Sequence, residues 1–82
     1  MFINKAENGS NNLCGSSVAA LRIKRGLSQR QLADMLQLEG LEIDKNAIQR
    51  IEAGKRFVTD IELVKLAKVF AVDYQDLIGL PR

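Results

Sequence analysis

The fold is decided by residues 28–54, which read SQRQLADMLQLEGLEIDKNAIQRIEAG. Ser28 and Gln31 have the spacing of a capping box, which predicts that a helix begins directly after Ser28. Asp44 is expected to cap a second helix, and Gly54 is expected to end it, because glycine accepts the left-handed conformation that often follows a helix. Two short helices joined by a connection that contains a glycine are typical of a helix-turn-helix.

Helical periodicity continues on both sides of these two helices. The expected boundaries outside 28–54 are, in chain order, a start at Ser16 or Ser17, an end at Gly26, a cap at Thr59 or Asp60, and a cap at Asp73. The expected inner residues of the five helices are Val18 and Leu21; Leu32, Ala33 and Leu36; Ala47, Ile48 and Ile51; Leu63, Leu66, Ala67 and Phe70; and Tyr74, Leu77 and Ile78. No segment alternates polar and apolar residues over the length of a strand, so we predict an all-α fold, a compact bundle of five short helices.

The helical pattern covers residues 16–79, which we expect to form the one folded domain. Residues 1–15 contain many Asn, Gly and Ser residues, which favour turns and coil, and are expected to form a flexible N-terminal arm. Residues 80–82 are expected to be a short C-terminal tail.

The composition excludes several classes of function. The chain has 82 residues, no histidine and a single cysteine, Cys14, so it offers neither an internal disulfide nor a zinc site. Paired carboxylates and a glycine-rich phosphate loop are also missing, and we expect no enzyme, no cofactor and no metal. No apolar run approaches the about 18 residues of a membrane-spanning helix, so we expect a soluble, cytoplasmic protein without a membrane partner. The helices use almost the whole chain, so we expect no separate domain for a small-molecule ligand.

The charge is concentrated in the middle of the chain. The net charge is +2, and residues 22–56 carry eight basic and five acidic residues. A modestly basic centre is compatible with a polyanionic partner. Ordinary solvated helix faces carry similar charges, so the charge alone does not distinguish a surface that binds a polyanion from an ordinary one.

The helix after Asp44 has two different sides. At about 100° per residue, its apolar residues face the core and its polar residues face outward. The outward residues are Lys45, Asn46, Gln49, Arg50 and Ala53. Asn and Gln can bond adenine bidentately, and Lys or Arg can bond guanine, in a DNA major groove. An ordinary solvated helix face would contain the same residue types.

Two neighbouring features favour nucleic acid. The capped start of the helix after Ser28 presents free backbone N–H groups beside Gln29 and Arg30, where a phosphate fits. Lys55 and Arg56 follow the polar helix directly and could hold a second phosphate, although they could equally form a charged turn.

Three blocks of the sequence, residues 21–33, 48–56 and 63–77, resemble the lambda-repressor-like, Cro-type (XRE family) helix-turn-helix domain. The resemblance implies a sequence-specific DNA-binding transcriptional regulator, a repressor in our expectation, that binds double-stranded DNA as a homodimer. The residues that it implies for reading base edges are Lys45, Asn46, Gln49 and Arg50. Those that it implies for DNA phosphates are Gln29, Lys55 and Arg56, to which the charge beside the helix start adds Arg30.

The resemblance also implies a salt bridge between Arg22 and Glu52. The helical positions are compatible with it, because each residue borders the apolar stripe of its own helix and the two stripes must meet in the core. The alternative is two independent surface charges.

The connection between the second and third helices is longer than the short turn usual in the family. Its apolar residues Leu38, Leu41 and Ile43 are expected to be buried and to keep the connection compact. Its acidic residues are Glu39, Glu42 and Asp44. Negative charge near the expected DNA face opposes phosphate binding, so a helical protein-interaction module on the same fold, without DNA binding, is the alternative function.

Overall fold

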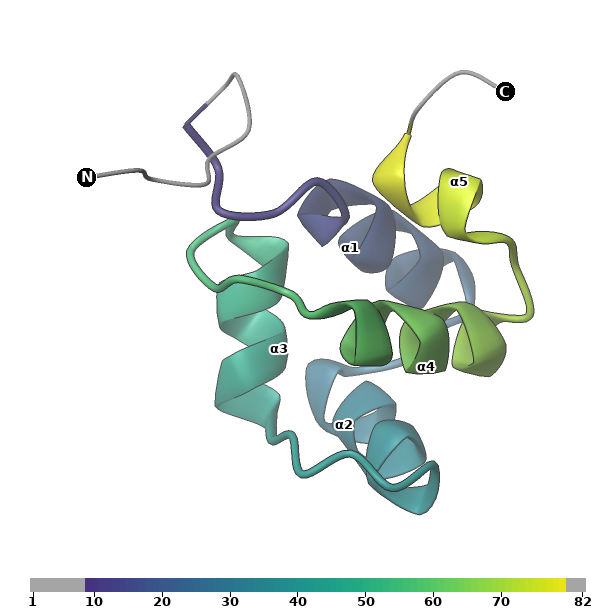
Figure 1. The fold of residues 1–82 in the computed structure, drawn as a ribbon. Helices are drawn as coiled ribbons and strands as arrows, with labels where there is room; N and C mark the ends of the chain where they lie inside the picture. The colour runs from purple at the N-terminus through teal and green to yellow at the C-terminus, as the bar shows by residue number, and fades with distance from the viewer. Residues whose placement is uncertain (1–8, 80–82) are drawn as a thin grey trace.

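The computed structural model describes residues 9–79, and that range contains five α-helices and no strand. The helices are α1 (Gly15–Lys24), α2 (Gln29–Leu38), α3 (Lys45–Glu52), α4 (Asp60–Phe70) and α5 (Tyr74–Ile78). The helix α3 packs against α1 and α2, while α5 packs against α1 and α4 (Figure 1). The all-α prediction of five short helices is therefore confirmed.

Local capping explains where three of the helices begin. Ser28 Oγ accepts a hydrogen bond from the Gln31 backbone N–H at 3.0 Å, and Gln31 Oε1 accepts one from the Ser28 N–H at 2.8 Å. Thr59 and Glu62 form the same reciprocal pair at the start of α4. Asp44 Oδ1 accepts from the Ala47 N–H at 2.8 Å and begins α3. These hydrogen bonds confirm the predicted caps. The sequence predicts them well because each cap depends only on residues three positions apart.

The start of α1 differs from the expected start at Ser16 or Ser17. The helix begins at Gly15 and its N-cap residue is Cys14, whose side chain makes no capping hydrogen bond. The Gly15 N–H donates to Asn12 Oδ1 at 2.8 Å, so the side-chain acceptor at the start of the helix is an asparagine of the preceding segment and not the expected serine. The prediction was wrong because two serines suited to capping lie inside the first turn.

One continuous core lies between the helices. Its fully buried members are Cys14, Val18, Leu32, Ala33, Leu36, Ile43, Ile48, Ile51, Leu66, Ala67, Phe70 and Leu77. Most of the residues predicted to face inward are in this cluster or packed against it. Tyr74 is an exception, because its side chain is largely exposed on α5.

The long connection between α2 and α3 is compact, but not in the way we expected. Ile43 is buried and Leu41 packs against the core, and Gln37 Nε2 donates to the Ile43 carbonyl oxygen at 2.8 Å. Leu38, in contrast, is 88% exposed, so the expectation that it is buried was wrong. Leu38 follows the buried Leu36 by two residues, about 200° around the helix, and this turns its side chain to solvent.

Residues 9–14, the described part of the stretch expected to form a flexible arm, lie against the end of α3. In Figure 1 the purple segment that precedes α1 crosses the end of α3, and hydrogen bonds from Asn11 and Asn12 join the two. Cys14 is buried in the core, where burial raises the pKa of its thiol. Residues 1–8 and the tail 80–82 lie outside the described residues. None of the helices described is long and apolar enough to cross a membrane.

Candidate nucleic-acid interface

The outward face of α3 is polar and exposed. Ile48 and Ile51 on its inner side are fully buried, which fixes the rotation of the helix about its axis. The four predicted base-reading residues, Lys45, Asn46, Gln49 and Arg50, are all exposed on the other side. Within residues 9–79 none of the four side chains makes a hydrogen bond or an ion pair, so their donors and acceptors remain available to a ligand.

An ion pair ties α3 to α1. Arg22 Nε donates to Glu52 Oε2 at 2.7 Å, and a second guanidinium nitrogen donates to Glu52 Oε1 at 3.1 Å. The two side chains are only 15% and 9% exposed, and the remaining terminal nitrogen of Arg22 donates to the Leu27 carbonyl at 2.8 Å. The hydrogen bond to Glu52 raises the pKa of Arg22. This bidentate geometry is the arrangement expected for the pair rather than two independent charges.

Gln29 joins this pair, which the sequence did not indicate. Its Nε2 donates to Glu52 Oε1 at 3.1 Å, so the first residue of α2 is linked to the last residue of α3. The amide retains a second N–H and its oxygen for other partners. Arg30, next to it, is exposed at the capped start of α2.

The structure treats Lys55 and Arg56 differently. Lys55 is exposed and its side chain has no partner in the described part of the chain. Arg56 instead forms a bidentate pair with Glu62, with two N–O distances of 2.9 Å. This pairing raises the pKa of Arg56 and lowers the pKa of Glu62. Arg56 therefore fastens the loop after α3 to the start of α4, which differs from the expected free cation for a phosphate.

The acidic residues of the long connection are partly neutralised. Glu39 pairs with Lys68 of α4 at 2.6 Å, and this contact lowers the pKa of Glu39. The Asp44 carboxylate is engaged in capping α3. Glu42 is exposed and has no partner among residues 9–79. The opposing charge expected near the polar face is thus offset at Glu39, whereas Asp44 and Glu42 make no salt bridge within residues 9–79.

The fold and the face of α3 together define a class of protein, the small helix-turn-helix domain whose last helix of the motif has an exposed polar face. A helix-turn-helix family model matches residues 18–77. The chain belongs to the helix-turn-helix family of DNA-binding regulators, and it is not an enzyme.

Two solved structures are similar to the chain. The restriction-modification controller protein C.AhdI from Aeromonas hydrophila is 28% identical, with a TM-score of 0.67, over 77% of this chain and 84% of that one. The DNA-binding domain of BldD is 25% identical, with a TM-score of 0.70, over 89% of this chain and 99% of that one. No curated protein sequence matches the chain.

Proposed function

We propose that the chain is a sequence-specific transcriptional repressor that places α3 in the major groove of double-stranded DNA. The observation that carries this proposal is the face of Lys45, Asn46, Gln49 and Arg50, exposed and unpaired on a helix whose opposite side is fully buried. A helix held in this way presents fixed amides and cations to a groove without first breaking internal bonds.

Each part of the surface has a role in this proposal. Asn46 and Gln49 offer paired donors and acceptors that suit adenine, and Lys45 and Arg50 offer donors that suit guanine. The backbone N–H groups at the start of α2, with Gln29 and Arg30, hold a phosphate of the DNA backbone. Lys55 holds another. Phosphate contacts set the register of the protein on DNA, whereas the α3 contacts select the sequence.

Binding as a homodimer completes the proposal. A single α3 reads few base pairs, and two copies would read half-sites about one helical turn apart. Ile78 at the end of α5 lines a hollow with Leu13, Val58 and Leu63, and this apolar surface is our candidate for the contact between copies. Leu80, the next apolar residue along the chain, lies outside the described residues. A dimer bound across a promoter would repress by occluding it.

The test is a selection of binding sites from random duplex DNA, followed by titration of the enriched duplex at several salt concentrations. We expect one enriched, two-fold symmetric sequence. The logarithm of the affinity should fall linearly with the logarithm of the salt concentration, with a slope of about −0.9 per phosphate contacted. Light scattering of the free and bound protein gives the number of copies.

The failure of this test would favour the second candidate, a helical protein-interaction module. Its supporting observation is the long connection, where Leu38 is 88% exposed and Glu42 is exposed without a partner among residues 9–79. Negligible affinity for every duplex at low salt, with no enriched sequence, would contradict DNA binding and leave this connection as the functional surface.

A further inference from the structure

We propose that Ser10, Asn11 and Asn12 form an N-terminal clamp that sets the position of the last turn of α3 and of the loop after it. Asn12 is the positioning residue of this clamp. It acts through α3 and touches no base. The inference rests on the proposed DNA-reading role of α3 for its functional consequence, but the clamp itself can be tested without DNA.

The end of α3 needs external support. The helix has eight residues, and helices this short are marginal without tertiary contacts. It closes with Gly54 at a φ of 74°, where the Gly54 N–H donates to the Ile51 carbonyl at 3.0 Å and the Lys55 N–H to the Arg50 carbonyl at 2.9 Å. This Schellman arrangement satisfies part of the last turn and turns the chain towards α4.

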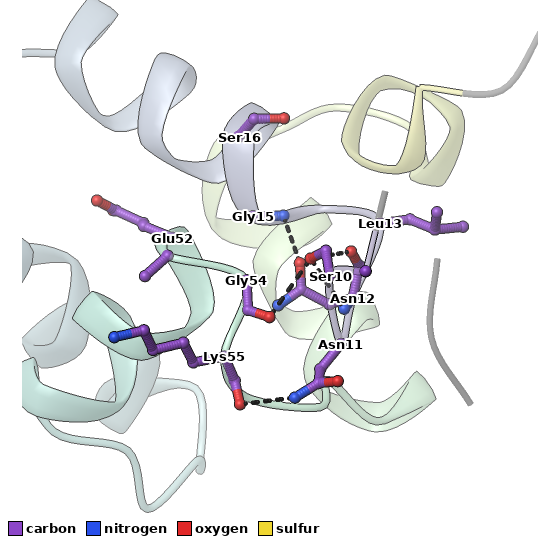
Figure 2. Close-up of a pocket in the computed structure, with 11 residues that line it drawn as sticks. Ser10, Asn11, Asn12, Leu13, Gly15, Ser16, Glu52, Gly54 and Lys55 are labelled. Carbon is purple, nitrogen blue, oxygen red and sulfur yellow. Dashed lines mark hydrogen bonds between the residues drawn. The ribbon is translucent and has the colours of Figure 1, made fainter. Parts of the chain in front are cut away.

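Asn12 supplies a second connection between α3 and α1, beside the Arg22–Glu52 pair. Its Nδ2 donates to the Ile51 carbonyl at 3.1 Å and to the Arg56 carbonyl at 2.8 Å, while its Oδ1 accepts from the Gly15 N–H at 2.8 Å. Three of the four hydrogen bonds available to an amide are therefore made. One side chain joins the first turn of α1, the last turn of α3 and the loop that follows it. Figure 2 shows the first of these bonds, between Asn12 and Gly15.

The other two clamp residues hold the same loop. The Asn11 backbone N–H donates to the Gly54 carbonyl at 2.8 Å, and Asn11 Nδ2 donates to the Lys55 carbonyl at 3.0 Å. Ser10 Oγ donates to the Asn12 carbonyl at 2.8 Å and also reaches the Gly54 carbonyl at 3.4 Å. The loop bonded in this way contains Lys55, the cation that we assign to a DNA phosphate.

Two glycines show how closely these elements approach. A Cβ at Gly15 would collide with the Ile51 carbonyl oxygen, and a Cβ at Gly54 would collide with Ser10 Oγ. The start of α1 and the clamp therefore pack directly against the end of α3, with no space for a side chain between them. A site that reads bases must be held to about 0.5 Å, and these contacts restrict α3 at the end opposite its cap.

Three variants and a control separate positioning from general stability. Asn12→Asp keeps an acceptor for the Gly15 N–H but replaces the donor to Ile51 and Arg56 with a carboxylate. Asn12→Ala removes all three bonds, and Asn11→Ala is a milder change that removes only the bond to the Lys55 carbonyl. The control is Leu77→Val, a core change in α5, which packs against α1 and α4.

Two measurements are made on each full-length protein, at a temperature where every variant is folded. The first is amide hydrogen exchange of residues 50–57. The second is affinity for the duplex selected from random DNA. We expect both Asn12 variants to speed exchange in residues 50–57 and to lower affinity about tenfold or more, because the loss of one hydrogen bond corresponds to roughly that factor and each variant loses at least two. Leu77→Val should lower the urea midpoint. Its amide exchange in residues 50–57 should be no faster than its loss of global unfolding free energy explains.

The clamp is contradicted if Asn12→Asp exchanges residues 50–57 no faster than Leu77→Val at equal stability. If Asn12→Ala does not fold, Asn12→Asp and Asn11→Ala decide by the same two measurements. If the unaltered protein binds no DNA, the proposed function fails, whereas the exchange measurement still decides whether the clamp holds α3.

Discussion

Arg22, Glu52 and Gln29 form one network in which residues from three helices meet at a single carboxylate. The sequence could indicate the first two, because each borders an apolar stripe and the family resemblance pairs them. It could not indicate Gln29, because a hydrogen bond across 23 residues depends on how α2 and α3 cross, and no local pattern encodes that angle. For the same reason Arg56 was assigned to a phosphate although it pairs with Glu62.

The Arg22–Glu52 pair should show strong coupling. Removing one partner leaves a charge largely shielded from water, so Arg22→Met or Glu52→Leu is expected to cost up to about 3–5 kcal/mol, and the double variant less than the sum. A double-mutant cycle by urea unfolding measures this coupling. The matched control is the more exposed pair of Glu39 and Lys68, for which a cycle should give much weaker coupling. Equal and small couplings in both cycles would remove the ion pair as a support of α3.

Lys55 and Arg56 should separate into two kinds of effect. We expect Lys55→Ala to weaken binding to every duplex by a similar factor and to reduce the salt slope by about one, with unchanged stability. Arg56→Ala should lower the urea midpoint, because the partly buried Glu62 loses its partner. Unfolding curves and salt titrations of both variants check this. A stable Arg56→Ala protein with a reduced salt slope would return Arg56 to the phosphate contacts.

At the scale of elements, the sequence predicts best what is decided within one turn of chain. The caps of α2, α3 and α4 were predictable because donor and acceptor lie three residues apart. The exposure of Leu38 was missed because an apolar residue in a long connection was assumed to be buried, although its helical phase opposes Leu36. Asn12 was missed because an Asn-rich stretch is typical of coil and its partners lie 39 and 44 residues away.

The start of α4 should make the stability of the fold depend on pH. The hydrogen bond from Arg56 is the largest cause that lowers the pKa of Glu62 below its ordinary 4.5 in the folded chain. A carboxylate of this kind stabilises the fold above its unfolded pKa, and the contribution disappears as the pH falls through the lower, folded value. We therefore expect Glu62→Gln to lower the unfolding free energy at pH 7, with the difference from the unaltered protein shrinking as the pH falls below 4.5.

Urea unfolding of both proteins over this pH range measures that difference. Glu42→Gln is the matched control, because Glu42 is exposed and has no partner in the described chain. A constant difference between Glu62→Gln and the unaltered protein at all pH values would show that the carboxylate charge contributes nothing to the cap.

In the whole molecule, several independent contacts hold one short helix in place. Buried Ile48 and Ile51 fix the rotation of α3 about its axis. The Arg22–Glu52–Gln29 network joins its last turn to α1 and α2. The N-terminal clamp is hydrogen-bonded to its end. A helix of eight residues has little stability of its own, so its precise placement must come from these contacts. Together these contacts fix the position of the polar face of α3.

The most direct test of this account is the discrimination between DNA sequences by Gln49→Ala. Its affinity for the selected duplex and for a scrambled duplex is measured beside the unaltered protein and beside Gln75→Ala, which removes an exposed amide from α5. We expect Gln49→Ala to lose about 1–3 kcal/mol of discrimination per half-site, confined to one base pair, while Gln75→Ala loses none. A Gln49→Ala protein whose affinities for both duplexes change by the same factor would contradict the claim that α3 reads the sequence.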